Sequence, residues 1–97
     1  MRRILWTSRA RADLRAIRAF ISQESPHVAG VVIARIVAAT ERIARFPESG
    51  RTVPEFRRPD VREVIHRPYQ VVYRLVGANE IHVLTVHHAA RRLPRLP

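Results

Sequence analysis

The sequence predicts an α+β fold in which an N-terminal strand and an antiparallel two-helix hairpin precede a three-stranded antiparallel meander. Residues 8–45 carry two apolar stripes at helical spacing, with a capping residue and a proline between them. Residues 61–88 contain three runs rich in Val, Ile and Tyr, separated by connections of hairpin length. The simplest arrangement packs the helices on one sheet face and leaves the other face open.

The first strand and the first helix are predicted from the opening residues. Arg3–Thr7 (RILWT) has a β-branched or bulky residue at most positions, which is typical of a short strand. Ser8 can then cap a helix over Arg9–Gln23 with its hydroxyl. The apolar residues that recur there at helical spacing are Leu14, Ile17 and Ile21.

The second helix is predicted over Pro26–Arg45. Ser25 supplies a capping side chain, and proline suits the first helical position because its missing N–H would be unpaired there. Pro47 ends the helix. The residues expected on its buried face are Ala29, Val32, Ile33, Ile36, Thr40 and Ile43. Because only a short connection joins the two helices, they should lie antiparallel.

The remainder of the chain is predicted to be a loop followed by three strands. Pro47–Asp60 contains three prolines and a glycine, so a loop is expected, with a short extended piece around Thr52–Phe56. The strands are predicted over Val61–His66, Tyr69–Val76 and Ile81–His87.

Length and composition indicate one domain covering residues 1–97, with an ordinary hydrophobic content of 46%. No apolar run approaches the ~18 residues that span a bilayer, so no membrane partner is expected. The apolar stretch Ile4–Trp6 is too short for the core of a signal peptide, and we therefore expect a cytoplasmic protein. The absence of cysteine excludes disulfides and cysteine-based zinc sites.

The chain is strongly basic, with a formal net charge of +10. All 18 basic residues are arginine, a preference that a GC-rich genome favours; the alternative is that arginine is used to bind phosphate or carboxylate bidentately. The charge excess itself indicates a polyanionic partner, either nucleic acid or an acidic protein.

The histidines are candidates for acid–base chemistry. His82 and His88 share a sheet face, but about 20 Å of strand separates them, so no metal site is expected. His87 or His88 could act as a general acid or base, because imidazole titrates near neutral pH; the alternative is that both are ordinary polar residues at a strand end. No Gly-rich phosphate loop is present, and no cofactor is expected.

Two further patterns each allow two interpretations. Tyr69 and Tyr73 share one face of a strand and form either a core pair or a platform for nucleotide stacking. The first helix carries a basic stripe beside its apolar stripe, with alanines opposite. The basic stripe is Arg11, Arg15 and Arg18, and the alanines are Ala12, Ala16 and Ala19. These alanines are either neutral helix formers or a close-packing surface for a partner.

Several short segments occur in an order and spacing that are specific when taken together. They are ILWTSRARADLRAI, RFPESGR, Val53–Glu55, Arg62–Val64, YQVVYR and IHVLTVHHAARR. In this order they resemble the RelE/ParE toxin superfamily of bacterial type II toxin–antitoxin systems. The resemblance implies a toxin that a cognate acidic antitoxin neutralises within a hetero-oligomer.

The resemblance leaves three functions open. The ParE-like branch inhibits DNA gyrase and has no chemistry of its own, whereas the RelE-like branch cuts messenger RNA on the ribosome; a degenerate member would only bind antitoxin. Gln70, Ala89 and Ala90 stand where the nuclease branch commonly has cationic residues, which favours the ParE-like, non-enzymatic interpretation. A nuclease would use Arg62, His87 and Arg91.

Arginines are the expected binding residues. Antitoxin contact is expected on the first helix and on the exposed sheet face, through Arg11, Arg15, Arg18, Arg62 and Arg74. Contact with the target, gyrase or alternatively the ribosome and mRNA, is expected in the basic loop and tail. The residues expected there are Arg51, Arg57, Arg58, Arg91, Arg92 and Arg95.

Overall fold

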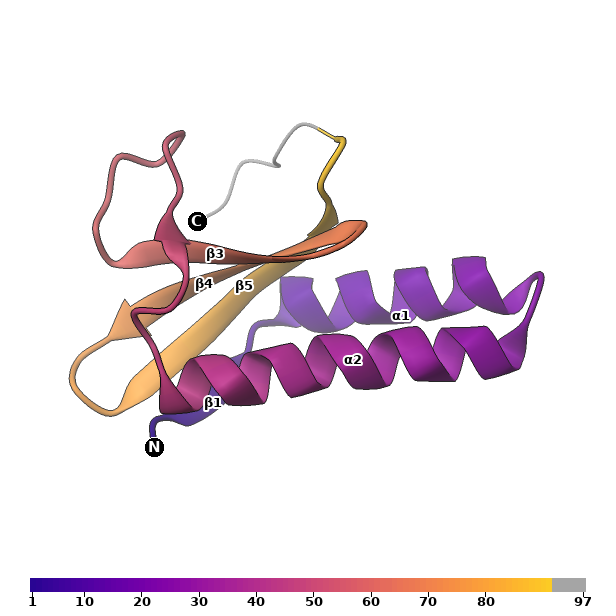
Figure 1. The fold of residues 1–97 in the computed structure, drawn as a ribbon, viewed down its shortest axis with the longest axis horizontal. Helices are drawn as coiled ribbons and strands as arrows, with labels where there is room; N and C mark the ends of the chain where they lie inside the picture. Colours follow the sequence, from indigo (N-terminus) through magenta and orange to yellow (C-terminus); the bar gives the residue numbers. More distant parts are fainter. Residues whose placement is uncertain (92–97) are drawn as a thin grey trace.

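The computed structural model describes residues 1–91, in which a helical hairpin packs on one face of a five-stranded sheet (Figure 1). The helices are α1 (Ser8–Ser22) and α2 (Pro26–Arg45). The strands are β1 (Arg3–Trp6), β2 (Arg51–Thr52), β3 (Val61–His66), β4 (Tyr69–Val76) and β5 (Glu80–His88). The predicted α+β class, hairpin and meander are confirmed. No helix in residues 1–91 combines the length and apolar character needed to cross a membrane.

Helix α1 is capped by Thr7, so the prediction of Ser8 as the cap is wrong by one residue. The Thr7 hydroxyl accepts a hydrogen bond of 3.1 Å from Ala10 N and donates one of 2.8 Å to Val83 O. Thr7 is favoured over Ser8 because the backbone is still extended where it leaves β1, as a capping residue requires. The helix therefore starts and ends one residue earlier than expected.

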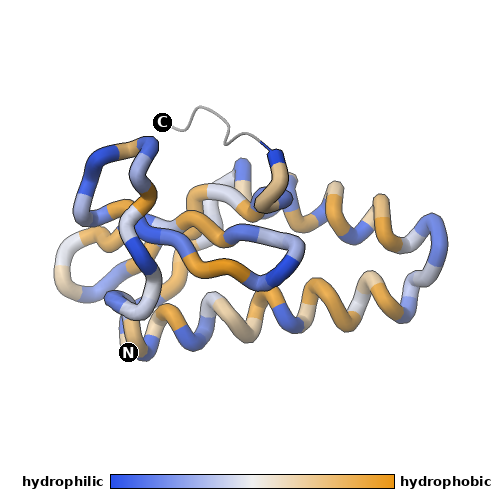
Figure 2. The backbone as a smooth tube through the Cα atoms, turned by 45° about the horizontal axis from the view of Figure 1, so that its top comes forward, coloured by the Kyte–Doolittle hydropathy of each residue, from blue (hydrophilic) through white to orange (hydrophobic). Residues whose placement is uncertain are grey.

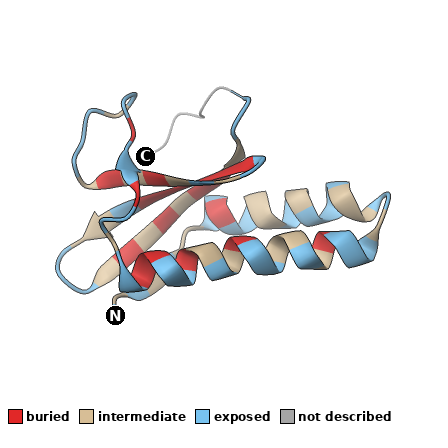
Figure 3. Ribbon diagram, in the orientation of Figure 1, coloured by how far each residue is buried: buried red, intermediate tan, exposed pale blue. Residues whose placement is uncertain are grey.

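Helix α2 begins and ends at the predicted residues, with Ser25 Oγ accepting from Val28 N at 3.1 Å. Hydrophobic and hydrophilic residues alternate along both helices (Figure 2). Figure 3 shows that most of the buried residues lie where the hairpin covers the sheet. Of the predicted inner face, Ala29, Ile36, Thr40 and Ile43 are buried, whereas Val32 and Ile33 are half-buried.

The strand order is β1-β5-β4-β3-β2, and only the β1–β5 pair is parallel. Strand β1 pairs with Glu80–Val83 and leaves the second half of β5 without a strand on that side. At the other edge, the extended piece expected around Thr52–Phe56 is instead the two-residue β2, which ends where that piece was to begin. The chain turns there because Pro54 has no N–H, and Phe56 N bonds back to Val53 O at 3.1 Å.

Tyr73 closes the core between the helices and the sheet. It is completely buried; its hydroxyl donates to Pro47 O at 2.8 Å and accepts from Gly50 N at 3.1 Å, which ties the loop after α2 to the sheet. Burial raises the pKa of Tyr73 above its ordinary value. Tyr69 is 8% exposed, so the two tyrosines belong to the core and the nucleotide-stacking interpretation is wrong.

The sheet face away from the helices is not fully open, contrary to expectation. The loop before β3 folds over it, and a second apolar cluster forms beneath. Its members are Val53, Phe56, Val61, Val72 and Leu84. Leu84 is the extra residue at a shift in register, since Val72 pairs with Thr85 and Tyr73 pairs with Val83. Val53 of the Pro-rich loop is completely buried, so this loop packs against the sheet and covers part of this face.

Candidate binding groove and cationic surface

A groove of about 510 Å³ lies between α1 and the C-terminal half of β5. Helix α1 contributes Arg9, Asp13, Ala16, Ile17 and Phe20. The sheet and the residues after it contribute Tyr69, Val86, His87, His88 and Arg91. The groove exists because β1 stops at Trp6, so the end of β5 faces helix α1 in place of another strand.

Asp13 joins the helix to this part of β5. One carboxylate oxygen accepts from Val86 N at 3.1 Å and also from the Thr85 hydroxyl. The other oxygen lies 3.5 Å from Arg9 Nε. A side-chain carboxylate thus satisfies a strand-edge donor that a neighbouring strand would otherwise bond.

The groove is lined by apolar side chains, by the Arg9–Asp13 pair and by Arg91. Phe20 is 69% exposed although it sits beside Ala16 and Ile17, so a large aromatic surface faces solvent. The ring of His88 packs edge-on against Tyr69, with ring centroids 5.9 Å apart. Apolar side chains beside the exposed Arg91 suit an amphipathic segment that carries a carboxylate.

The three residues expected of a nuclease do not converge. In the sheet register Arg62 lies opposite Tyr73, on the helix side, whereas His87 lies opposite Gln70, which faces the other way. Arg62 donates to Gly50 O at 2.9 Å, and its Nε is buried with no partner among residues 1–91. His87 Nε2 lies 2.8 Å from Arg91 O, so the imidazole holds the backbone after β5.

Gln70 and Glu63 form a buried polar pair on the face away from the helices. The Gln70 amide donates to the Glu63 carboxylate, whose side chain is 3% exposed. Arg51 Nε completes the cluster at 2.7 Å from Glu63. The Gln70 side chain is therefore buried and bonded within the fold, and it is not available to contact a ligand.

The arginines expected to contact antitoxin do not form one surface. Arg11, Arg15 and Arg18 are all exposed on α1, and Arg11 Nε donates to Trp6 O at 3.3 Å. The expectation that Arg62 and Arg74 share an exposed sheet face is wrong. Arg74 lies opposite Val61, one residue out of phase with Arg62, and bonds Asp60 on the other face.

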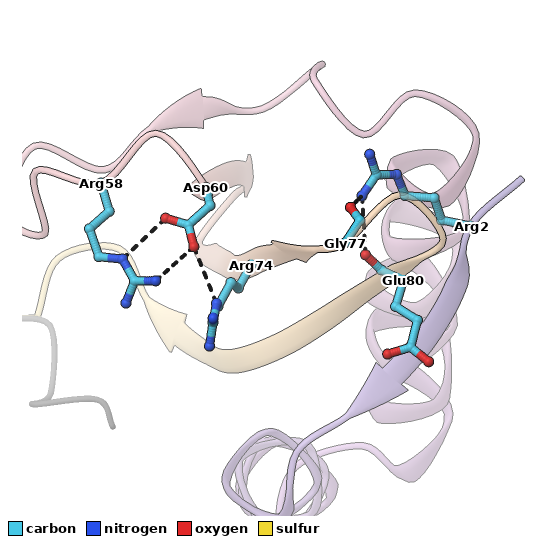
Figure 4. A network of polar contacts seen from close by, with 6 residues as sticks. All are labelled: Arg2, Arg58, Asp60, Arg74, Gly77 and Glu80. Carbon is cyan, nitrogen blue, oxygen red and sulfur yellow. Dashed lines mark hydrogen bonds and ion pairs between the residues drawn. The ribbon is translucent and has the colours of Figure 1, made fainter.

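Of the four described arginines expected to contact the target, Arg51 and Arg58 are engaged in ion pairs within the fold. Arg58 and Arg74 both bond the carboxylate of Asp60, at 2.7 and 3.2 Å (Figure 4). The hydrogen bond from Arg58 is the main reason that the pKa of Asp60 is lowered. Arg57 is exposed and Arg91 lines the groove; Arg92 and Arg95 lie outside the described residues. Within residues 1–91, no group of three potential ligands could hold a metal ion.

Asp13 and Glu63 are the functional-looking carboxylates that the sequence interpretation missed. Asp13 precedes Ile17 by four residues, which places a carboxylate within the apolar stripe of α1. That position is a usable signal, because a charged group on an inner helix face needs a hydrogen-bond partner. No comparable signal identifies the partner of Glu63, which depends on strand register.

The known proteins to which this chain is similar include toxins and a toxin–antitoxin system. The family described as ParE toxin of type II toxin–antitoxin system, parDE, matches residues 4–93. The chain is 36% identical over 91 residues to "Toxin RelE2" of Caulobacter vibrioides, covering 94% of this chain and 99% of that protein. A second toxin, from Sinorhizobium fredii, is 36% identical over 97 residues, with 98% and 96% covered. A solved structure, "Chromosomal ParDE TA system from P. aeruginosa", is similar with a TM-score of 0.73 and 27% identity, covering 91% of this chain and 96% of that one.

Proposed function

We propose that this chain, which belongs to the family of ParE toxins of type II toxin–antitoxin systems, inhibits DNA gyrase and is neutralised by a cognate acidic antitoxin. Inhibition would require binding and no chemistry. The basic surface and the apolar groove are both features of a binding protein.

The observation that carries the proposal is the separation of Arg62 from His87. A ribonuclease needs a proton-transfer group and a cation at the same phosphate. Here the register directs these two side chains to opposite sheet faces, and backbone carbonyls hold both of them. Gln70 is buried against Glu63 and offers no positive charge.

A ribosome-dependent mRNA endonuclease is the second candidate. It is favoured by the name of one relative, "Toxin RelE2", and by the placement of His87, His88 and Arg91 around one groove. These three groups could meet a phosphate without Arg62. Two assays on the purified chain therefore decide between the candidates.

The first assay measures supercoiling by purified gyrase, and the second measures cleavage of ribosome-bound message. We expect inhibition of gyrase, no cleavage, and the same gyrase inhibition from His87→Ala as from the unaltered chain. His27→Ala, which removes an exposed histidine from α2, is the matched control. Cleavage that His87→Ala abolishes and His27→Ala retains would establish the nuclease. A chain that does neither, but binds antitoxin, would be a degenerate member.

The groove beside α1 is our proposed antitoxin site. Its apolar residues would accept the apolar face of an antitoxin helix, and Arg91 would pair with a flanking carboxylate. Arg11, Arg15 and Arg18 are exposed on the side of α1 opposite the residues that line the groove, where they offer a separate positive surface to an acidic partner. No ion pair within residues 1–91 neutralises these three arginines, so they remain available to an acidic partner.

A further inference from the structure

Strand β1 forms an edge of the sheet with backbone groups that point away from it. Arg3 N bonds Asn79 O at 2.8 Å and Thr7 N bonds Val83 O at 3.2 Å, so the odd-numbered residues face β5. Because alternate residues of a strand direct their N–H and C=O to opposite sides, those of Ile4 and Trp6 face outward. Figure 1 shows β1 at the margin of the sheet.

Part of this edge is already satisfied. Arg2 N donates to Ala44 O at 3.0 Å, and Trp6 O accepts from Arg11 Nε at 3.3 Å. The Ile4 N–H, the Ile4 C=O and the Trp6 N–H have no hydrogen-bond partner within residues 1–91. Together they present the donor–acceptor–donor pattern that an added strand would bond.

A second groove, of about 420 Å³, runs beside these groups. Its walls are Leu14 of α1 and Val37 of α2, and Leu5 of β1 is 44% exposed beside it. The opposite edge of the sheet is different, because β2 has two residues, is followed closely by Pro54, and is held by the Arg51–Glu63 ion pair. Strand β1 is therefore the edge of the described sheet that can be extended.

We propose that an extended acidic segment of the neutralising partner adds to β1 as a sixth strand, an inference that rests on the proposed function. Arg11 flanks the free backbone groups and has no acidic partner within residues 1–91, Arg3 lies beside them paired with Glu80, and Arg2 is held nearby through Gly77 O and Glu80 O (Figure 4). These cations favour carboxylates and disfavour a second copy of this chain, which would place its own Arg3 and Arg11 against them.

The geometry also specifies the pattern of that segment. In an added strand, alternate side chains point toward the helices, where Leu14 and Val37 require apolar residues. The side chains between them point to the other face, beside Leu5 and Arg3, where carboxylates fit. The segment is thus an alternation of apolar and acidic residues, with main-chain bonds giving affinity and the groove giving specificity.

The direct test is amide hydrogen exchange of the full chain, alone and in complex with the full-length antitoxin encoded beside it. We expect the Ile4 and Trp6 amides to exchange rapidly in the free chain and to be protected at least tenfold in the complex. Leu5, which bonds β5, should be protected in both states. A complex that forms without protecting Ile4 and Trp6 would overturn the proposal. Protection in the free chain that rises with its concentration would assign the edge to a second copy.

A variant separates the edge from the toxin's action. Ile4→Pro removes the outward N–H without removing a bond to β5, and Ile4→Val removes a similar volume while keeping that N–H. We expect Ile4→Pro to bind antitoxin roughly tenfold more weakly than Ile4→Val and to inhibit gyrase equally. Equal antitoxin affinities for Ile4→Pro and Ile4→Val would refute the addition of a strand to β1. Absence of gyrase inhibition in the unaltered chain would refute only the proposed function.

A synthetic peptide of alternating Glu and Val, six residues long, tests the chemistry without any antitoxin. It should protect the Ile4 and Trp6 amides at millimolar concentration, whereas the matching Lys–Val peptide should not. Protection by both peptides, or by neither, would contradict the charge argument that selects an acidic strand.

Discussion

Phe20→Ala should weaken antitoxin binding without weakening the fold. Phe20 is 69% exposed in the groove beside α1, so little of its ring stabilises the free chain. A partner that fills the groove would bury that exposed surface. The loss on truncation should therefore appear in the dissociation constant and not in the free energy of unfolding.

The expected magnitude follows from the exposed area. Complete burial of a phenylalanine covers about 200 Å², so the exposed part corresponds to about 140 Å². At ~25 cal/mol per Å² this area is worth about 3.5 kcal/mol, of which the remaining alanine retains about a third. The difference of about 2 kcal/mol corresponds to roughly a 30-fold weaker dissociation constant.

Phe46→Ala is the matched control. Phe46 has a similar exposure, 62%, but lies at the C-terminal end of α2 and does not line the groove. Surface plasmon resonance with immobilised antitoxin should show faster dissociation for Phe20→Ala and an unchanged rate for Phe46→Ala, with urea midpoints similar in both. Equal affinities for the two variants would refute the assignment of the groove.

Two further predictions concern the contact that closes the core. Gly50→Ala should cost about 3 kcal/mol in urea unfolding, because its Cβ would lie 2.6 Å from Glu63 O and closer still to the Tyr73 hydroxyl. Gly30→Ala lies in the second turn of α2, where the added Cβ would meet nothing within 4 Å outside its own helix backbone, and should gain about 0.5–1 kcal/mol. Destabilisation by both would contradict this contrast. Because the pKa of Tyr73 is raised in the folded chain, the neutral hydroxyl contributes its full share to the free energy of unfolding below pH 10.0. That stabilisation declines as pH rises through the higher pKa of the folded state. Thermal unfolding between neutral and alkaline pH should show this loss in the unaltered chain and not in Tyr73→Phe, and an identical alkaline decline in both would refute it.

The elements were predictable because their signals are local. Ser25 followed by Pro26 marks the start of α2, and Pro47 lies just beyond its end, so both boundaries matched. The turn residues on either side of β3 and β4 likewise marked where those strands begin and end. The cap of α1 was misplaced because Thr7 and Ser8 are both good capping residues, and the hydrogen bond from Thr7 to the distant Val83 distinguishes them.

The candidate site was not predictable because it depends on contacts between distant segments. The groove forms where β1 ends opposite Val83, about eighty residues along the chain, and Asp13 bonds Val86 across it. Periodicity places Asp13 on an inner helix face but cannot name its partner. The Arg62–Arg74 error has a simpler cause: the two residues lie on different strands, so the register of the strands alone decides whether they share a face.

The charge of the chain does not by itself select its partner. Half of the eight acidic residues bond arginine or backbone within the fold, namely Asp13, Asp60, Glu63 and Glu80. The arginines of α1 thus present an excess that would attract antitoxin, DNA-bound gyrase or ribosome alike, chiefly by speeding association. Discrimination between these partners must come from shaped binding surfaces, because the lifetime of a complex depends on packing and hydrogen bonds at its interface. The Phe20 groove and the free edge of β1 are such features: the groove suits an amphipathic helix and the edge an extended acidic strand, and neither suits a nucleic acid.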